Sequence, residues 1–316
     1  MTKIEREDIQ IISRHSNWSA GSIDKILKQE IYSDKEAWKK FLRLFFISLG
    51  VSFTTAGIIF FFAYNWADLH KFIKIGLIEG LIVMTTLIAL FSKVSLDIKN
   101  ILLTGASMLV GVLFAVFGQI YQTGANAYDF FLGWTLFIAL WVVISNFAPL
   151  WLVFITLINT SLVFYSQQVA HEWSDIFVAT LLFLINVSFL TATLLGKTFL
   201  EGFRPPNWFS NLIALAAVSL STIGITIGIF NNYEASFFVL VIITAILYTI
   251  GIQYGLKAKS GFYLSIIPFS LIVIISAFLI KLSEDAGMFF FISLFVIASV
   301  TFVIRNLIYL QKKWMN

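Results

Sequence analysis

The stretch that decides the fold is ILLTGASMLVGVLFAVFGQIY, residues 101–121, which contains no Asp, Glu, Lys, Arg or His. A helix needs about 20 residues to cross the hydrocarbon core of a bilayer, because each residue advances it by about 1.5 Å. This stretch is long enough and apolar enough to do so. We therefore predict that it is a transmembrane helix.

Similar apolar runs lie on both sides of this stretch. Of the 316 residues, 59% are hydrophobic and 12% are charged, with a mean hydropathy of +0.92, which excludes an ordinary soluble domain. Such long runs also disfavour an outer-membrane barrel, whose strands alternate polar and apolar residues. We predict an all-α, polytopic membrane protein with about ten spans, near residues 42–64, 73–92, 101–121, 130–147, 149–166, 176–195, 209–230, 236–256, 262–280 and 288–306.

The break between the fourth and fifth spans is very short. It consists of Asn146, Phe147, Ala148 and Pro149, which predicts a tight helical hairpin. Ten spans permit two five-span halves in inverted orientation, as in many secondary transporters. No convincing internal repeat is present in the sequence.

Residues 1–41 form a polar segment before the membrane domain of residues 42–316. The segment lacks the apolar core and cleavage site of a signal peptide, so we expect it to be retained in the cytosol. Capping-box patterns at Thr2 and Ser33 predict short helices, the last of which runs into the first span. About 40 residues rarely bury a self-sufficient core, so this segment is expected to contact the membrane domain, lipid headgroups or a partner.

The distribution of basic residues predicts the orientation, because loops rich in Lys and Arg resist translocation. With the N-terminus in the cytosol, 18 of the 21 basic residues fall on the cytosolic side, and only Lys71, Lys74 and Lys281 fall outside. We therefore expect both termini in the cytosol. Topology accounts for the net charge of +4, so nucleic acid is not an expected partner.

Glu79 is the one carboxylate inside a predicted span. An ionisable group in hydrocarbon is costly unless it is paired, protonated or hydrated, so it marks a candidate functional interior. Gly76 and Gly80 flank it at a spacing that lets another helix approach closely. The alternative is a Glu79 that only fixes helix packing through a hydrogen bond.

A polar stretch without Lys or Arg follows the third span. Its candidate ligand groups, together with Glu79, are Gln119, Tyr121, Gln122, Asn126 and Asp129. Gly124 can supply a turn that other residues resist. The stretch is either the lining of an outward-facing cavity for a cation or polar solute, or an ordinary interfacial loop beside an aromatic belt.

Small residues at helical spacing predict close helix contacts elsewhere in the chain. Asn159, Asn186, Asn211 and Gln253 lie within predicted spans, where such residues usually bridge helices. The glycines that we assign to helix packing are Gly76, Gly80, Gly111, Gly224, Gly228, Gly251 and Gly255.

The residues of common enzymatic chemistry are missing from the predicted spans. The chain has no Cys, its three His lie outside the spans, and no Asp lies within one, which excludes intramembrane Ser–His and aspartyl proteases. A phosphate-binding Gly-x-x-x-x-Gly-Lys-Ser/Thr loop is also absent. The cluster at residues 171–175 has one His and is a weak candidate for metal. We expect no catalytic residues, no cofactor and no metal site.

A family resemblance rests on the first half of the sequence. A polar helical N-terminus with Trp18, the Gly118-Gln119-x-Tyr121-Gln122 element and an aromatic fourth helix with Gly133-Trp134 resemble the bacterial predicted membrane proteins called domain of unknown function 2157. The resemblance extends through Trp141. It implies a multi-pass helical fold and carries no established activity.

Two functions follow as expectations. The first is transporter-like, or solute- or cation-binding, through an outward-facing polar cavity near Glu79. The second is a non-enzymatic scaffold or sensor that binds a protein partner through the cytosolic N-terminal segment. Membrane lipid is an expected partner in both, the expected location is the bacterial cytoplasmic (inner) membrane, and nothing in the sequence specifies an oligomeric state.

Overall fold

The computed structural model describes residues 9, 19–27, 35–64, 70–121, 124, 126–199, 205–231, 235–282 and 285–315. Within these residues every regular element is a helix, and no strand occurs. The predicted all-α class is therefore confirmed. The predicted capping boxes at Thr2 and Ser33 begin outside the described residues.

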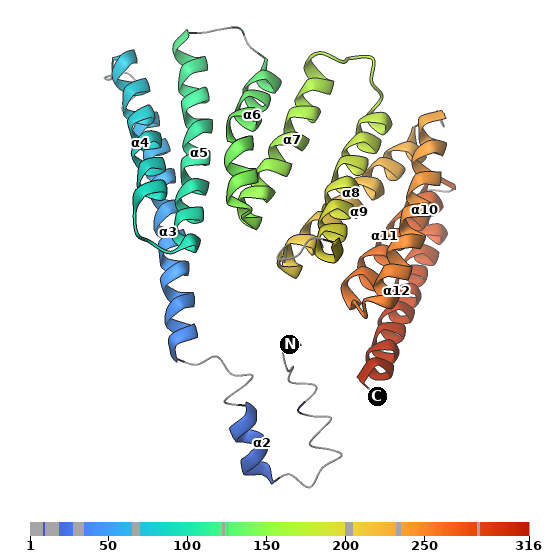
Figure 1. The fold of residues 1–316 in the computed structure, drawn as a ribbon. Helices are drawn as coiled ribbons and strands as arrows, with labels where there is room; N and C mark the ends of the chain where they lie inside the picture. Colours follow the sequence, from blue (N-terminus) through green and yellow to red (C-terminus); the bar gives the residue numbers. More distant parts are fainter. Residues whose placement is uncertain are drawn as a thin grey trace. The chain divides into compact units, whose positions relative to one another are not determined.

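Ten helices of the described part are long and apolar enough to cross a membrane, as predicted. A short helix, α2 (Ala20–Ile26), precedes them. The ten are α3 (Lys35–Tyr64), α4 (Lys71–Phe91), α5 (Leu96–Tyr121), α6 (Ala127–Ser145), α7 (Ala148–Gln168), α8 (Asp175–Phe199), α9 (Asn207–Phe230), α10 (Ala235–Lys257), α11 (Gly261–Leu282) and α12 (Ala286–Met315) (Figure 1). The first of these is continuous from the polar segment into the membrane domain, as expected.

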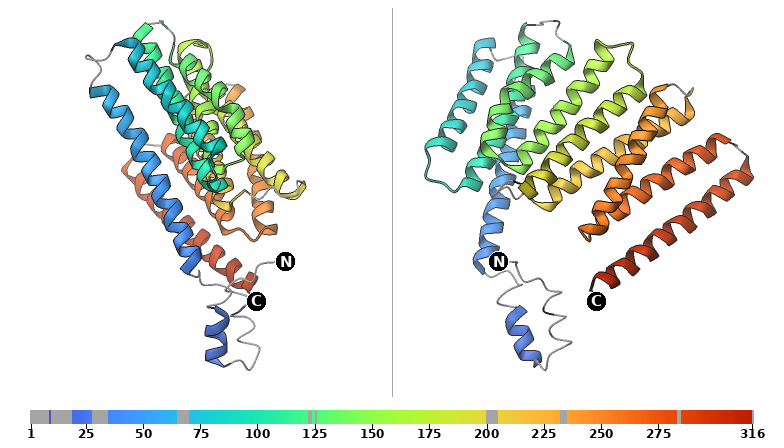
Figure 2. Two further views of the ribbon diagram at one scale, coloured as in Figure 1. Left: turned by 60° about the vertical axis from the view of Figure 1, so that its left-hand side comes forward. Right: turned by 45° about the vertical axis from the view of Figure 1, so that its right-hand side comes forward.

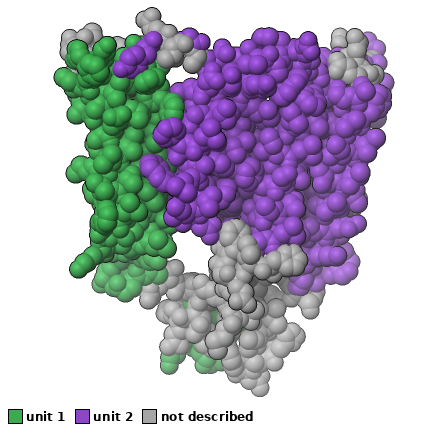
Figure 3. Space-filling view, turned by 45° about the horizontal axis from the view of Figure 1, so that its top comes forward, with its two compact units in different colours: residues 1–120, 315 green, residues 121–314, 316 purple. Residues whose placement is uncertain are grey.

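The chain divides into two compact units (Figure 3). Unit 1 comprises residues 1–120 with residue 315, and unit 2 comprises residues 121–314 with residue 316. Unit 1 contains α3 to α5 and unit 2 contains α6 to α12, so the division does not follow two five-span halves. Within unit 2, helices that follow one another in the chain run in opposite directions (Figure 2).

Unit 1 is held together by an apolar contact between α4 and α5. Ile78 and Val116 are buried at its centre, and other apolar side chains of the two helices pack against them. A Cβ on Gly105 of α5 would lie 2.6 Å from Val51 Cγ1 of α3, so these two helices also approach closely. At one end of the unit, Lys40 Nζ and Asp97 Oδ2 form an exposed ion pair at 3.3 Å.

In unit 2, α6 and α7 form the predicted tight hairpin. The first helix ends at Ser145 and the second begins at Ala148. Asn146 ends α6 in the left-handed conformation, with φ 44°, which Asn adopts more readily than most residues. Pro149 lies in the first turn of α7, where a missing N–H is tolerated.

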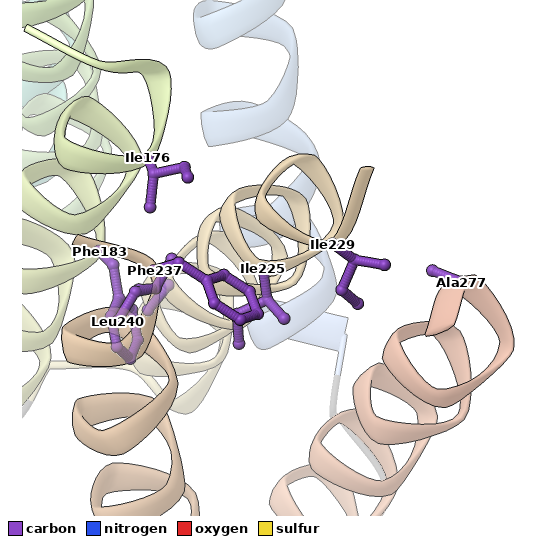
Figure 4. Close-up of a cluster of buried hydrophobic side chains, with 8 residues drawn as sticks. Ile176, Phe183, Ile225, Ile229, Phe237, Leu240 and Ala277 are labelled. Carbon is purple, nitrogen blue, oxygen red and sulfur yellow. The ribbon is translucent and has the colours of Figure 1, made fainter. Parts of the chain in front are cut away.

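The main core of unit 2 lies among α8, α9, α10 and α11 (Figure 4). Glycines of α9 permit this packing, because a Cβ on Gly224 would lie 2.7 Å from Ala179 Cβ and 2.8 Å from Leu240 Cδ2. The next glycine along the helix, Gly228, faces the Phe237 ring. The buried core residues are Ile176, Phe183, Ala217, Ile225, Ile229, Phe237, Leu240 and Ala277.

The other glycines assigned to packing fall into two groups. Gly251 and Gly255 of α10 face α11, since their added Cβ atoms would lie 2.7 Å from Ile267 Cδ1 and 3.0 Å from Leu264 Cγ. Gly111 is buried within α5. By contrast, no described atom lies within 4 Å of a Cβ built on Gly76 or Gly80, so their spacing marks no helix contact in the described part of unit 1.

Candidate functional site

The predicted site residues of unit 1 lie on exposed helix surface. Glu79 follows the buried Ile78 on α4, and its own side chain is exposed. Gln119, near the end of α5, is also exposed. No hydrogen bond or ion pair of Glu79 is present among the described residues. Unit 1 therefore does not by itself enclose the carboxylate, and the polar interior around Glu79 stays a prediction.

The predicted site residues of unit 2 build the start of α6. The Asn126 backbone N–H donates to Asp129 Oδ2 at 3.2 Å, as in a helix capping box. Gly124 has φ +61°, the positive value expected for a turn. Tyr121 is exposed at the end of α5, and Gln122 lies outside the described residues. Capping explains Asn126 and Asp129 without a ligand.

Aromatic side chains surround this end of α6 and support the interfacial alternative. The rings of Tyr128 and Tyr165 lie 5.3 Å apart edge to face, and Trp173 continues the cluster at 5.5 Å from Tyr165. The Tyr128 backbone N–H donates to Gln168 Oε1 at 3.1 Å, which joins the start of α6 to the end of α7. Such rings are typical of the membrane–water interface.

A shallow hollow lies at the same end of unit 2. It has a volume of about 500 Å³ and is lined by Glu172, Trp173, Ser174, Phe177, Ala235 and Ser236. None of the candidate ligand residues from Glu79 to Asp129 lines it, whereas Glu172, Trp173 and Ser174 belong to the weak metal candidate at residues 171–175. Within the described residues no group of three or more His, Cys, Asp or Glu could hold a metal ion.

Two buried polar clusters join the helices of unit 2. Asn186 Nδ2 of α8 donates to Asn159 Oδ1 of α7 at 2.8 Å, which is the helix bridge that in-span amides predict. The second cluster joins α9, α10 and α11, because the Tyr248 hydroxyl lies 2.8 Å from Ser221 Oγ and 2.6 Å from Ser270 Oγ. Each cluster satisfies its own polar atoms, so both are explained by packing.

A cavity of about 600 Å³ lies at the opposite end of unit 2 from the hollow. Its wall is formed by the α6–α7 turn, the later turns of α8 and the start of α9. Five aromatic residues line it: Phe147, Trp151, Phe189, Trp208 and Phe209. Three prolines and four other residues complete the wall, namely Pro149, Pro205, Pro206, Asn146, Ala148, Ala192 and Thr193.

The cavity lies at the basic end of unit 2, the end that carries Lys197, Lys257, Lys259, Lys312 and Lys313. Lys197 follows Thr193 by one helical turn on α8, so the two side chains lie on the same side of the helix. Its Nζ contacts Asn207 Oδ1 and Ser210 Oγ, each at 3.2 Å. These residues flank Trp208 and Phe209 of the cavity wall, so Lys197 fixes the start of α9 beside the cavity.

The sequence reasoning missed this cavity. The signal available to it was the clustering of Trp and Pro next to two breaks between helices, at Pro149-Leu150-Trp151 and Pro205-Pro206-Asn207-Trp208. Proline lacks the backbone N–H that a helix interior requires, so it favours a break between helices. The neighbouring Trp side chains therefore lie beside such breaks. Only the spatial proximity of the two segments makes this a site, and hydropathy does not encode that proximity.

The comparisons with known proteins agree with this helical membrane fold. No curated protein and no solved structure matches the chain. The family described as Predicted membrane protein (DUF2157) matches residues 18–151. That range contains the Gly118 to Gln122 element and the Gly133-Trp134 pair on which the resemblance rests. The resemblance is therefore confirmed over residues 18–151, which are similar to the DUF2157 family of predicted membrane proteins.

Proposed function

We propose that the protein is a non-enzymatic, transporter-like membrane protein that binds a small molecule in the cavity at the basic end of unit 2. The observation that carries the proposal is the cavity itself. Its volume of about 600 Å³ lies within the range of about 300–1,000 Å³ that is typical of small-molecule sites. An aromatic wall with few polar groups is also typical of such sites.

The lining indicates the chemistry of the ligand. Burying apolar surface is favourable by roughly 25 cal/mol per Å², and aromatic walls accept flat or chain-like apolar groups through close contact. Thr193 is buried and already donates its hydroxyl to Phe189 O at 2.7 Å. The body of the ligand is therefore apolar.

The proposal includes a location and an orientation. We place the protein in the cytoplasmic (inner) membrane with both termini in the cytosol, because 18 of its 21 basic residues then lie on the cytosolic side. The cavity in this orientation opens towards the cytosol. The outward-facing site near Glu79 and Gln119 is a separate hypothesis, which cysteine labelling at position 79 tests.

The test uses photolabelling of the full-length protein in lipid nanodiscs. The probe is an alkyl-chain methyl ester with a diazirine on the chain, and labelled peptides are identified by mass spectrometry. We expect saturable labelling of peptides that contain Trp151, Phe189 or Trp208. Ala192→Phe fills the cavity from an exposed wall position and should abolish this labelling.

Thr191→Phe is the matched control, because Thr191 is exposed on α8 and does not line the cavity. It should label like the wild type. Labelling that is spread over lipid-facing helices, or that is insensitive to Ala192→Phe, would contradict the proposal.

Binding of a protein partner by the N-terminal segment is the second candidate. It is favoured by exposed aromatic rings at the start of α3, where Trp38 stacks on Phe41 at 5.2 Å and Phe41 stacks on Phe45 at 6.1 Å. This site is separate from the cavity. Deletion of residues 1–34 should therefore leave photolabelling of the cavity unchanged.

A further inference from the structure

We propose that the ligand of the cavity is an amphiphile with an anionic head, and that Lys197 binds this head. The inference rests on the proposed function and adds the chemical class of the ligand. It depends on three features that meet at one place: the apolar cavity, an ammonium group beside its wall, and the uncapped start of α9.

The first feature is the positive charge of Lys197, which no neighbouring carboxylate of the described structure neutralises. Its side chain is half-buried, and its two recorded partners, Asn207 Oδ1 and Ser210 Oγ, are both neutral. Among the described residues no carboxylate pairs with it. An ammonium group has three donors, so one donor and the full positive charge are left for a ligand.

The start of α9 adds to the same positive field. Its N-cap is Pro206, which forms no side-chain cap, and its first turn contains no acidic residue. In the part of the chain that the structure describes, no acceptor is recorded for the backbone N–H groups of Asn207 and Trp208. The N-terminal end of a helix carries a partial positive charge and favours anions.

Four of the described membrane helices carry an acid of the chain itself in the first turn. Glu36, Asp97, Asp129 and Asp175 lie in the first turns of α3, α5, α6 and α8. In those helices the protein itself supplies the negative charge that the helix end favours. The first turn of α9 contains no acid, which is also true of α4, α7, α10, α11 and α12. What distinguishes α9 is that the cation Lys197 bonds to Asn207 and Ser210 at its start, so an anionic ligand there would complement both the helix end and the ammonium group.

The geometry of the cavity relates the head to the apolar body. Trp208 and Phe209 belong to the cavity wall, and the two residues that contact Lys197 stand on either side of them. Lys197 does not itself line the cavity, but its two partners belong to the same first turn of α9 as Trp208 and Phe209. We therefore place the polar end of a ligand, whose chain lies between Trp151 and Phe209, beside Lys197. One cation and two N–H groups match a carboxylate or a phosphate, both of which present several acceptor oxygens.

Carboxylate and phosphate amphiphiles share this chemistry, and competition against the neutral photoprobe distinguishes them. The competitors carry the same alkyl chain with a carboxylate, a phosphate monoester, a methyl ester or a primary amine as head. We expect the two anions to displace the probe at concentrations at least about tenfold below those of the ester and the amine, since a charged hydrogen bond is worth about that factor. The anion that displaces the probe at the lower concentration identifies the head group of the ligand.

Variants assign the preference to Lys197. Lys197→Gln should reduce the preference for anions over the ester to within about twofold, whereas Lys197→Arg should retain it. Lys257→Gln removes a charge from the same end of unit 2 without touching the cavity, and it should also retain the preference. Unchanged labelling by the neutral probe in Lys197→Gln verifies that the cavity is still formed.

The outcomes separate the two proposals. If the cavity is labelled but the head charge has no effect, or if Lys197→Gln keeps the preference, the anionic ligand is wrong and the cavity remains a binding site. If the neutral probe does not label the cavity in the wild type, the proposed function fails and this inference fails with it.

Discussion

At the scale of single residues, two amides in the interior of unit 2, Asn159 and Asn186, are paired with one another. Asn186 is 1% exposed, and its side chain bonds both to Asn159 and to the carbonyl of Leu182 at 2.8 Å. An amide without a partner in such surroundings loses the hydrogen bonds that it makes in water. The value of the pair therefore lies chiefly in the cost of leaving one member alone.

We expect Asn186→Leu to destabilise the protein more than the double change of Asn159→Leu with Asn186→Leu. The single change leaves Asn159 without its partner on α8, at a cost of about 1 kcal/mol, whereas the double change removes both polar groups. Thermal unfolding in detergent, followed by tryptophan fluorescence, measures the difference. Equal midpoints for the single and double variants would show that the pair is not coupled.

Glu79, unlike the paired amides Asn159 and Asn186, is a polar group on exposed helix surface. A charged side chain in contact with hydrocarbon is unfavourable by several kcal/mol, so we expect this position to contact water or a polar group in the membrane. The chain has no Cys, which makes single-cysteine labelling direct. Glu79→Cys should react with a hydrophilic, membrane-impermeant thiol reagent.

The matched control is Met84→Cys on the same helix. Met84 is 60% exposed, and it lies about 140° around the helix from Glu79, as five residues at 3.6 per turn require. We expect little reaction there, because lipid covers that side. Equal reactivity at the two positions, or none at Glu79→Cys, would remove the predicted polar interior.

At the scale of elements, the ends of helices differ from the ends of apolar runs. Asp97, Asp129 and Asp175 precede the predicted spans, but they lie in the first turns of the helices α5, α6 and α8. A hydropathy criterion places the start of a span after the last charged residue that precedes the apolar run. The helix itself begins earlier, because an acid in the first turn accepts from free N–H groups and complements the helix dipole.

Small residues at equal spacing are not equivalent, and two alanine substitutions test this. A Cβ on Gly228 would collide with the Phe237 ring, whereas one on Gly76 meets open space. Gly228→Ala should lower the free energy of unfolding by about 1–3 kcal/mol through overpacking. Gly76→Ala should leave it unchanged or raise it by up to about 1 kcal/mol, because Ala favours helix over Gly. The same thermal unfolding assay compares both, and the reverse order would contradict the packing described here.

At the scale of the whole molecule, the sequence predicts the class, the number of spans and the α6–α7 hairpin. These features depend on local composition, which hydropathy measures directly. The division at residue 120 and the cavity depend on contacts between distant segments. The sequence offers Asn126 and Asp129 either as ligand groups or as part of an interfacial loop, because polarity alone does not distinguish a helix cap from a binding group. Lys197 contributes to the sequence prediction only through its charge. The pattern Asn-x-x-Asp before an apolar run would have indicated the cap.

The orientation in the membrane is the last prediction, and it belongs to the whole chain. Glu172→Cys, before α8, and Ala258→Cys, after α10, both lie at exposed positions. With both termini in the cytosol, an impermeant thiol reagent added to intact cells should label the first and not the second. Lysis should make Ala258→Cys reactive, which controls for accessibility. Labelling of Ala258→Cys alone in intact cells would mean that Lys and Arg do not set this topology, and the cavity would then face outwards.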